Sequence, residues 1–91
     1  MKYTVNAYVN IFKVHQATAY RWRKNPPPYL EYAKAAYTNR LKPLTSPQAA
    51  RYWKSLGVTP RTGTRWNTRA PLVARYAAAY IKWRIENHEN K

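Results

Sequence analysis

The chain contains no cysteine, and its 91 residues include only two glycines and three acidic residues. Without cysteine it can form neither a disulfide nor a cysteine-ligated zinc site. Gly57 and Gly63 cannot build the glycine-rich loop that holds phosphates in nucleotide-binding folds. Glu31, Glu86 and Glu89 are too few for the carboxylate cluster of a metal-dependent nuclease. We therefore expect a protein that is not an enzyme.

Long apolar runs are missing as well. No stretch approaches the roughly 20 apolar residues of a membrane span, and the first residues lack the apolar core of a secretory signal. His15 and His88 lie far apart in the sequence, and no carboxylate lies near the two of them together. We therefore expect no metal and no other cofactor. These observations predict a cytoplasmic protein without a membrane partner.

Large aliphatic residues are scarce, whereas positive charge is abundant. Val, Ile, Leu and Phe together number 14, against 13 Ala, 9 Tyr and 4 Trp, so we expect a small core of alanines and aromatic rings. Lys and Arg number 17, which gives a formal net charge of +14. The isoelectric point is near 10.5. A balance this basic indicates a polyanionic partner.

The chain matches itself without a gap when it is shifted by 44 residues. Nine of the 30 aligned pairs that begin with residues 8 and 52 are identical. They include Thr18 with Thr62, Arg21 with Arg65, and Trp22 with Trp66. Residues 1–44 hold eight cations and one acid, and residues 45–91 hold nine cations and two acids, so each half carries +7. A period of this length indicates one supersecondary unit used twice.

We predict an all-α fold of two tandem three-helix units, residues 1–44 and residues 45–91, with no β-sheet because no period-two run of β-branched residues occurs. The first unit is predicted to contain helices at Tyr3–Phe12, Gln16–Lys24 and Tyr29–Arg40. The second is predicted to contain Pro47–Leu56 with Ser46 as its N-cap, Pro60–Asn67 with Thr59 as its N-cap, and a longer helix at Leu72–Asn87 with apolar residues every four positions.

Residues 56–66, with the sequence LGVTPRTGTRW, resemble the helix-turn-helix of bacterial and phage transcriptional regulators. The physical requirements of that motif match this stretch. Gly57 accepts a positive φ in the turn, and Val58 fills the gap between the helices. Thr59 caps the second helix, Gly63 allows close helix contact, and Trp66 is expected in the core.

Residues 12–22 follow the same template with two departures. Lys13 stands where the second copy has its turn glycine, so Lys13 must adopt an unfavoured conformation or the turn must differ. His15 stands in place of the capping threonine and is a poorer N-cap. Trp22, like Trp66, is expected in the core because it lies at the inward spacing.

The helical period separates an inward stripe, positions 14, 18 and 22, from an outward one. The outward positions are 16, 17, 20, 21 and 24 in the first copy and 60, 61, 64, 65 and 68 in the second. The resemblance implies that this helix enters the major groove of DNA. The predicted base contacts are Gln16, Tyr20, Arg21, Arg61, Thr64 and Arg65. The predicted phosphate contacts are His15, Arg23, Lys24, Lys54, Thr59 and Arg69.

The leading hypothesis is a sequence-specific protein that binds double-stranded DNA, as a phage or mobile-element transcriptional regulator in a bacterial cytoplasm. Direct and inverted half-sites both remain open. An architectural or packaging protein with little sequence preference, or a protein that binds single strands by stacking, is the alternative. A phage protein that binds a host protein is a third reading. The longer C-terminal helix offers a surface for a homodimer.

Overall fold

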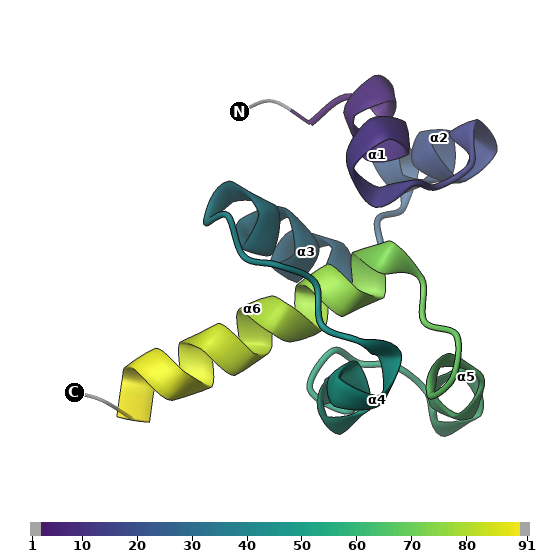
Figure 1. The fold of residues 1–91 in the computed structure, drawn as a ribbon. Coiled ribbons are helices and arrows are strands. Elements are labelled where there is room, and N and C mark those ends of the chain that lie inside the picture. The colour runs from purple at the N-terminus through teal and green to yellow at the C-terminus, as the bar shows by residue number, and fades with distance from the viewer. Residues whose placement is uncertain (1–2, 90–91) are drawn as a thin grey trace.

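The computed structural model describes residues 3–89 and the side chains of residues 3–87. The described chain is helical throughout and contains no strand, in agreement with the predicted all-α class (Figure 1). Its elements are α1 (Val5–Phe12), α2 (Gln16–Lys24), α3 (Pro28–Thr38), α4 (Ser46–Ala49), the 3-10 helix η1 (Ala50–Tyr52), α5 (Pro60–Trp66) and α6 (Leu72–Glu89).

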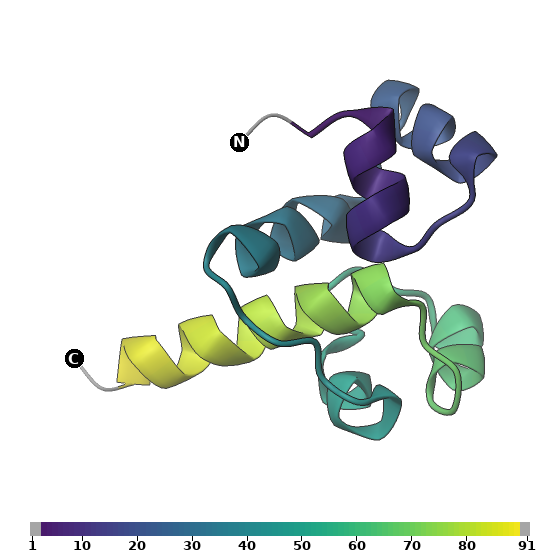
Figure 2. The ribbon, with the colours of Figure 1, turned by 45° about the horizontal axis from the view of Figure 1, so that its top comes forward.

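Helices α3 and α6 pack along each other in the middle of the molecule. The α1–α2 pair lies on one side of them and the α4–α5 pair on the other (Figures 1 and 2). Alanines such as Ala33 and Ala77 are fully buried, which allows the two backbones to come close. Tyrosines complete the contact, because Tyr32 stacks on Tyr80 with ring centroids 5.9 Å apart.

One hydrophobic core serves both halves of the chain. Its fully buried large side chains come from both, namely Phe12, Leu30, Leu56 and Val73. Most of the remaining core is alanine and aromatic, which confirms the composition expected from the scarcity of aliphatic residues. Aromatic edge-to-face contacts link the halves directly, because Phe12 meets Tyr76 of α6 at 5.7 Å. The two halves therefore fold as partners and do not each bury a separate core.

The predicted helix at Pro47–Leu56 is wrong in its second half. Only Ser46–Ala49 is α-helical, and the chain then tightens into η1 and a series of turns up to Gly57. The backbone N–H of Trp53 donates to Ala50 O at 3.5 Å, the i to i+3 spacing of a 3-10 turn. The tighter winding accompanies burial of the Trp53 ring against α5. A helical period in the sequence does not distinguish the two kinds of winding.

The prediction of Ser46 as the N-cap is also wrong, because Thr45 caps α4. Thr45 Oγ1 accepts from the Gln48 N–H at 3.4 Å, and Gln48 Oε1 accepts from the Thr45 N–H at 3.1 Å, which makes a capping box. Ser46 Oγ instead accepts from the backbone N–H of Ala70 at 3.0 Å. This bond ties the start of α4 to the connection between α5 and α6.

Three boundaries in the first half shift by one or two residues. Helix α1 begins at Val5 and not at Tyr3, because Thr4 Oγ1 caps it by accepting from the Ala7 N–H at 3.2 Å. Helix α3 runs from Pro28 to Thr38, and its end is closed by Arg40 in the left-handed region. Helices α2, α5 and α6 match their predicted starts.

Candidate nucleic-acid interface

Each half contains a turn with a left-handed residue before its second helix. Gly57 has φ of +77°, and the two bonds that close this turn run from the Val58 N–H to Trp53 O and from the Gly57 N–H to Lys54 O, at 3.0 and 3.2 Å. Lys13, 44 residues earlier, has φ of 56° and ψ of 39°. Lys13 thus takes the unfavoured conformation, which costs a side-chain-bearing residue about 1–2 kcal/mol.

Helices α2 and α5 are each capped by the residue two positions after the left-handed one. His15 Nδ1 accepts from the Ala17 N–H at 3.1 Å. Thr59 Oγ1 accepts from the Thr62 N–H at 3.4 Å and donates to Thr62 Oγ1 at 3.1 Å. The hydroxyl proton of Thr59 is therefore engaged within the helix end. His15 Nε2, by contrast, has no hydrogen-bond partner among the described residues and carries the proton when the ring is neutral.

The inward faces of α2 and α5 hold aromatic rings of unequal burial. Trp22 is buried, as predicted, with its ring edge-to-face on Tyr8 at 5.5 Å. Trp66 packs against the core, as predicted, but is only partly buried. It packs edge-to-face between Trp53, at 5.3 Å, and Tyr29, at 5.6 Å, and Trp53 takes the buried position in this half. Burial also raises the pKa of the Tyr29 hydroxyl.

Gly63 makes the close contact expected of it. A Cβ atom at this position would lie 3.3 Å from Trp53 Cδ1. The same edge of the indole is anchored by its N–H, since Nε1, the ring atom bonded to Cδ1, donates to Asn67 Oδ1 at 3.1 Å. The small residue thus lets α5 sit directly on the Trp53 ring.

The outward stripe of both helices is exposed at all ten predicted positions: 16, 17, 20, 21, 24, 60, 61, 64, 65 and 68. This includes all six predicted base contacts, Gln16, Tyr20, Arg21, Arg61, Thr64 and Arg65. Tyr20 is 55% exposed, which is high for an aromatic ring and leaves its face open for contact. Thr64 Oγ1 donates to Pro60 O at 2.9 Å, so this hydroxyl can meet a base only as an acceptor.

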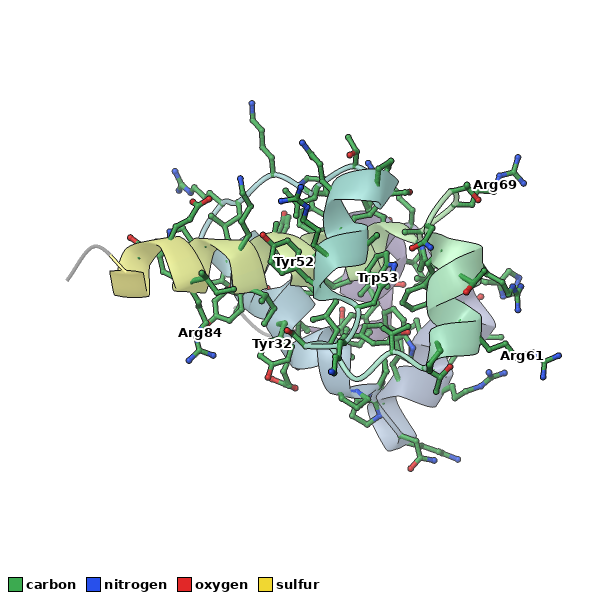
Figure 3. The ribbon with its side chains drawn as sticks, turned by 90° about the horizontal axis from the view of Figure 1, so that it is seen from below. Tyr32, Tyr52, Trp53, Arg61, Arg69 and Arg84 are labelled. Atoms are coloured by element: carbon green, nitrogen blue, oxygen red, sulfur yellow. The ribbon has the colours of Figure 1, made fainter. Side chains whose placement is uncertain are left out.

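The predicted phosphate contacts are exposed too and flank the same helices. Arg23 and Lys24 lie in the last turn of α2, while Lys54 and Arg69 lie in the turns before and after α5. Arg61 and Arg69 extend away from the body of the molecule beside α5 (Figure 3). Lys13, exposed at the tip of the first turn, belongs with this set and was not predicted. The sequence could have indicated this contact, because Lys13 is a cation close to the start of the second helix.

No negative charge offsets these cations. The sequence holds no acidic residue before Glu31 and none between Glu31 and Glu86. Every charged side chain of α2, α5 and their turns is therefore cationic. The ion pairs among the described residues are Glu31 with Lys34 and Lys82 with Glu86, both on the central helices. Helices α2 and α5 both lie at the end of the molecule where α6 begins (Figures 1 and 2). We call their outward stripes, together with the flanking cations, the α2–α5 face.

Comparison with known proteins gives no likeness to argue from, since no family model, curated protein or solved structure matches the chain. Within residues 3–89, no helix combines the length and apolar character needed to cross a bilayer.

Proposed function

We propose that the chain binds double-stranded DNA in a sequence-specific way through two tandem helix-turn-helix units, residues 1–44 and 45–91, as a phage or mobile-element transcriptional regulator. The observation that carries the proposal is the same arrangement at positions 44 residues apart. A left-handed residue, Lys13 or Gly57, precedes a capped helix whose outer stripe is exposed, cationic and free of acids.

The side chains on the α2–α5 face suit both kinds of DNA contact. Arg21, Arg61 and Arg65 present guanidinium groups that can bind the O6 and N7 atoms of guanine, and Gln16 can bind adenine. The cations at the ends of the two helices suit phosphates, which position the protein without reading sequence. Paired recognition elements, and not a diffuse basic coat, favour duplex DNA over a single strand.

The size of the molecule constrains how it meets a duplex. The principal extents are 37, 31 and 19 Å, whereas successive major grooves on one face of straight DNA lie roughly 34 Å apart. Helices α2 and α5 both lie at the end where α6 begins, so they do not use the full length of the molecule (Figure 1). We propose that the duplex bends toward the protein when both helices are inserted.

In vitro selection from random duplex DNA, followed by a salt titration on the selected site, tests this function. We expect a recovered motif that is preferred by about 10³-fold or more over random duplex. With six to eight phosphates neutralised, the logarithm of affinity should fall against the logarithm of salt with a slope of roughly −5 to −7. Recovery of no motif would contradict sequence-specific binding and favour an architectural protein, and a preference for single strands would favour binding by stacking.

Two substitutions separate the roles of the cations on that selected site. Arg65→Ala should relax preference at one base position, with a loss of about 1–3 kcal/mol against the preferred base. Lys24→Ala should weaken all sequences alike and make the salt slope shallower by about one. Arg84→Ala, on the opposite side of the molecule from Arg61 and Arg69 (Figure 3), is the matched control and should change neither quantity. Unchanged binding in both test variants would refute the assignment of the α2–α5 face.

A further inference from the structure

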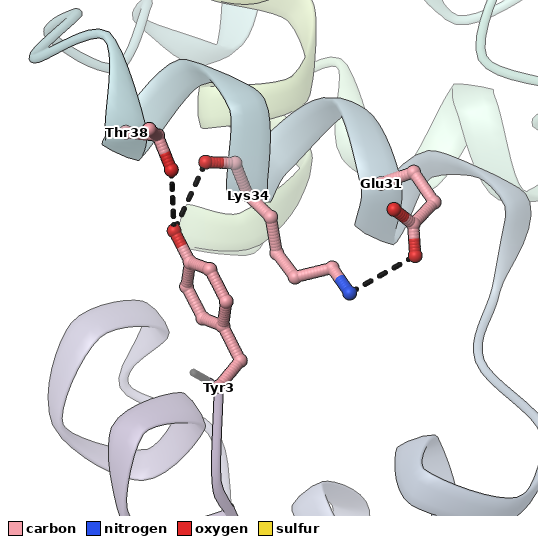
Figure 4. A network of polar contacts seen from close by, with 4 residues as sticks. All are labelled: Tyr3, Glu31, Lys34 and Thr38. Carbon is pink, nitrogen blue, oxygen red and sulfur yellow. Dashed lines mark hydrogen bonds and ion pairs between the residues drawn. The ribbon is translucent and has the colours of Figure 1, made fainter. Parts of the chain in front are cut away.

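The first half of the chain contains a seat for one phenol ring, and Tyr3 fills it (Figure 4). The Tyr3 hydroxyl donates to Lys34 O at 3.0 Å and shares a 2.9 Å hydrogen bond with Thr38 Oγ1. Its ring stacks on Tyr8, with centroids 6.1 Å apart and planes 17° from parallel, and Lys34 Nζ lies 5.6 Å from its centroid. A stacked ring, polar groups at its hydroxyl and a cation over its face define the seat.

That cation is itself held in place by a carboxylate. Lys34 Nζ lies 2.9 Å from Glu31 Oε1 one turn earlier on α3. Partial burial by itself lowers the pKa of Lys34. The hydrogen bond to Glu31 and the interactions with the Glu31 charge and with Tyr8 outweigh this effect and raise the pKa above its usual value. The ammonium group over the ring therefore stays charged at neutral pH.

The positions 44 residues later form an open groove between the α4–η1 segment and α6. The ring-stacking residue is preserved, since Tyr52 corresponds to Tyr8 and lies beside α6 in Figure 3. Tyr3 is replaced by Pro47 and Lys34 by Ala78, so neither the ring nor the cation above it has a counterpart. The groove has a volume of about 400 Å³ and is lined by Leu44, Pro47, Gln48, Arg51, Tyr52 and Lys82. We call it the Tyr52 groove.

The rim of the Tyr52 groove is cationic. Arg51 is exposed and has no ion-pair partner among the described residues. Lys82 is half exposed and lies 3.3 Å from Glu86, a pair that both solvent and a competing carboxylate can open. The guanidinium of Arg51 can take a carboxylate through two parallel hydrogen bonds.

We propose that the Tyr52 groove binds an acidic segment of a partner protein that carries a tyrosine or phenylalanine. The aromatic ring packs on Tyr52 as Tyr3 packs on Tyr8, and a neighbouring carboxylate meets Arg51 and Lys82. A single phenol ring occupies the counterpart seat, and we take an aromatic side chain as the occupant of the groove for that reason. Binding at the Tyr52 groove does not require DNA to be the partner of the α2–α5 face.

The groove lies apart from that face. In Figure 3 Tyr52 lies toward the middle of α6, whereas Arg61 and Arg69 project from the far side of α5. A partner protein can therefore occupy the Tyr52 groove while the α2–α5 face is engaged. This arrangement suits a protein that brings a second macromolecule to the site it occupies.

The test is a titration of the full 15N-labelled chain with the peptide N-acetyl-Glu-Tyr-Glu-amide, followed by NMR. We expect shifts confined to the backbone around residues 44–52 and 78–86. The double variant Arg51→Gln and Lys82→Gln should bind the peptide at least about ten-fold more weakly, because it loses the charge-assisted bonds. Lys42→Gln, which removes an exposed cation two residues from Leu44 but outside the groove, should bind as the parent does.

Four outcomes would overturn the proposal. Equal binding of N-acetyl-Gln-Tyr-Gln-amide would remove the role of charge, and equal binding of N-acetyl-Glu-Ala-Glu-amide would remove the role of the ring. Shifts centred on α2 and α5 would show that the peptide only follows net charge. Stronger shifts at the groove with a short oligothymidylate than with the peptide would assign it to nucleic acid. The spectrum of each variant reports its folding directly.

Discussion

At the scale of single residues, the backbone conformation at three positions decides where the chain reverses. Lys13, Arg40 and Gly57 all lie in the left-handed region, and only Gly57 reaches it without a steric cost. Arg40 closes α3 through bonds from its own N–H to Tyr37 O and from the Leu41 N–H to Ala36 O, at 3.0 and 2.9 Å. The first half therefore stores strain that the second half avoids at the corresponding turn.

Lys13→Gly should raise the free energy of unfolding by about 0.5–1 kcal/mol. The substitution removes the left-handed penalty of about 1–2 kcal/mol, partly offset by the greater freedom of glycine in the unfolded chain, roughly 0.5–1 kcal/mol. Urea denaturation followed by circular dichroism measures the change. Lys13→Ala, which keeps a Cβ, should give no such gain, and Gly57→Ala should lose about 1 kcal/mol. A Lys13→Gly variant no more stable than the parent would contradict the strain at this turn.

At the scale of elements, α5 is positioned by one tight contact between Gly63 and Trp53. The corresponding residues in the first half are Ala19 and Val9. The second half therefore pairs the smallest residue with the largest ring, whereas the first half pairs two residues of intermediate size. Ala19 is fully buried. The space that the methyl group of Ala19 fills in the first half is thus filled by the Trp53 indole in the second half.

Enlarging Gly63 should destabilise the fold in proportion to side-chain volume. Helix propensity alone predicts that Gly63→Ala stabilises α5 by about 1 kcal/mol. The 3.3 Å approach to Trp53 Cδ1 and the anchored indole oppose this, so we expect a net loss of about 1 kcal/mol for Ala and 2 or more for Val. Thermal and urea unfolding of the two variants measures both. If Gly63→Ala is more stable than the parent, the Trp53 ring moves freely and the contact does not position α5.

How well the elements follow from the sequence depends on how local their signals are. Helices α2, α5 and α6 begin where a capping residue or a proline indicates, because those effects involve a few neighbouring positions. The capping role of Thr45 is equally local, because its capping box joins residues three positions apart. The shortening of α4 and the partial exposure of Trp66 instead depend on contacts with α5 and α3. None of these contacts lies within one helical turn in the sequence.

At the scale of the whole molecule, one core and two outlying helices determine the shape offered to a partner. Because α3 and α6 pack together, α2 and α5 are fixed relative to each other within a molecule 37 Å long. The last turns of α6 leave Trp83 and Ile85 exposed, at 37% and 44%. The homodimer through this helix remains a prediction.

The selected DNA site should be bent in the complex. Because α2 and α5 do not span the full length of the molecule, we expect both to insert only if the duplex curves toward the protein, at a cost on the order of 1–6 kcal/mol for a 20–30 base-pair site. Energy transfer between dyes at the two ends of such a duplex should rise on binding. The same duplex with a random sequence, at matched occupancy, is the control. An unchanged end-to-end distance would mean that only one helix occupies a major groove.

The sequence by itself determined the helical class, the starts of α2, α5 and α6, the left-handed turn at Gly57 and the outward stripe of α2 and α5. These features depend on the helical period, on caps and on the conformational range of single residues, all of which act over a few positions. The tertiary structure alone decided that the two halves share one core, that Trp53 is buried where Trp66 is only partly so, and that a groove opens beside Tyr52. Those outcomes depend on which side chains meet across the fold. Protein interiors are closely packed, so one buried position holds only one large ring.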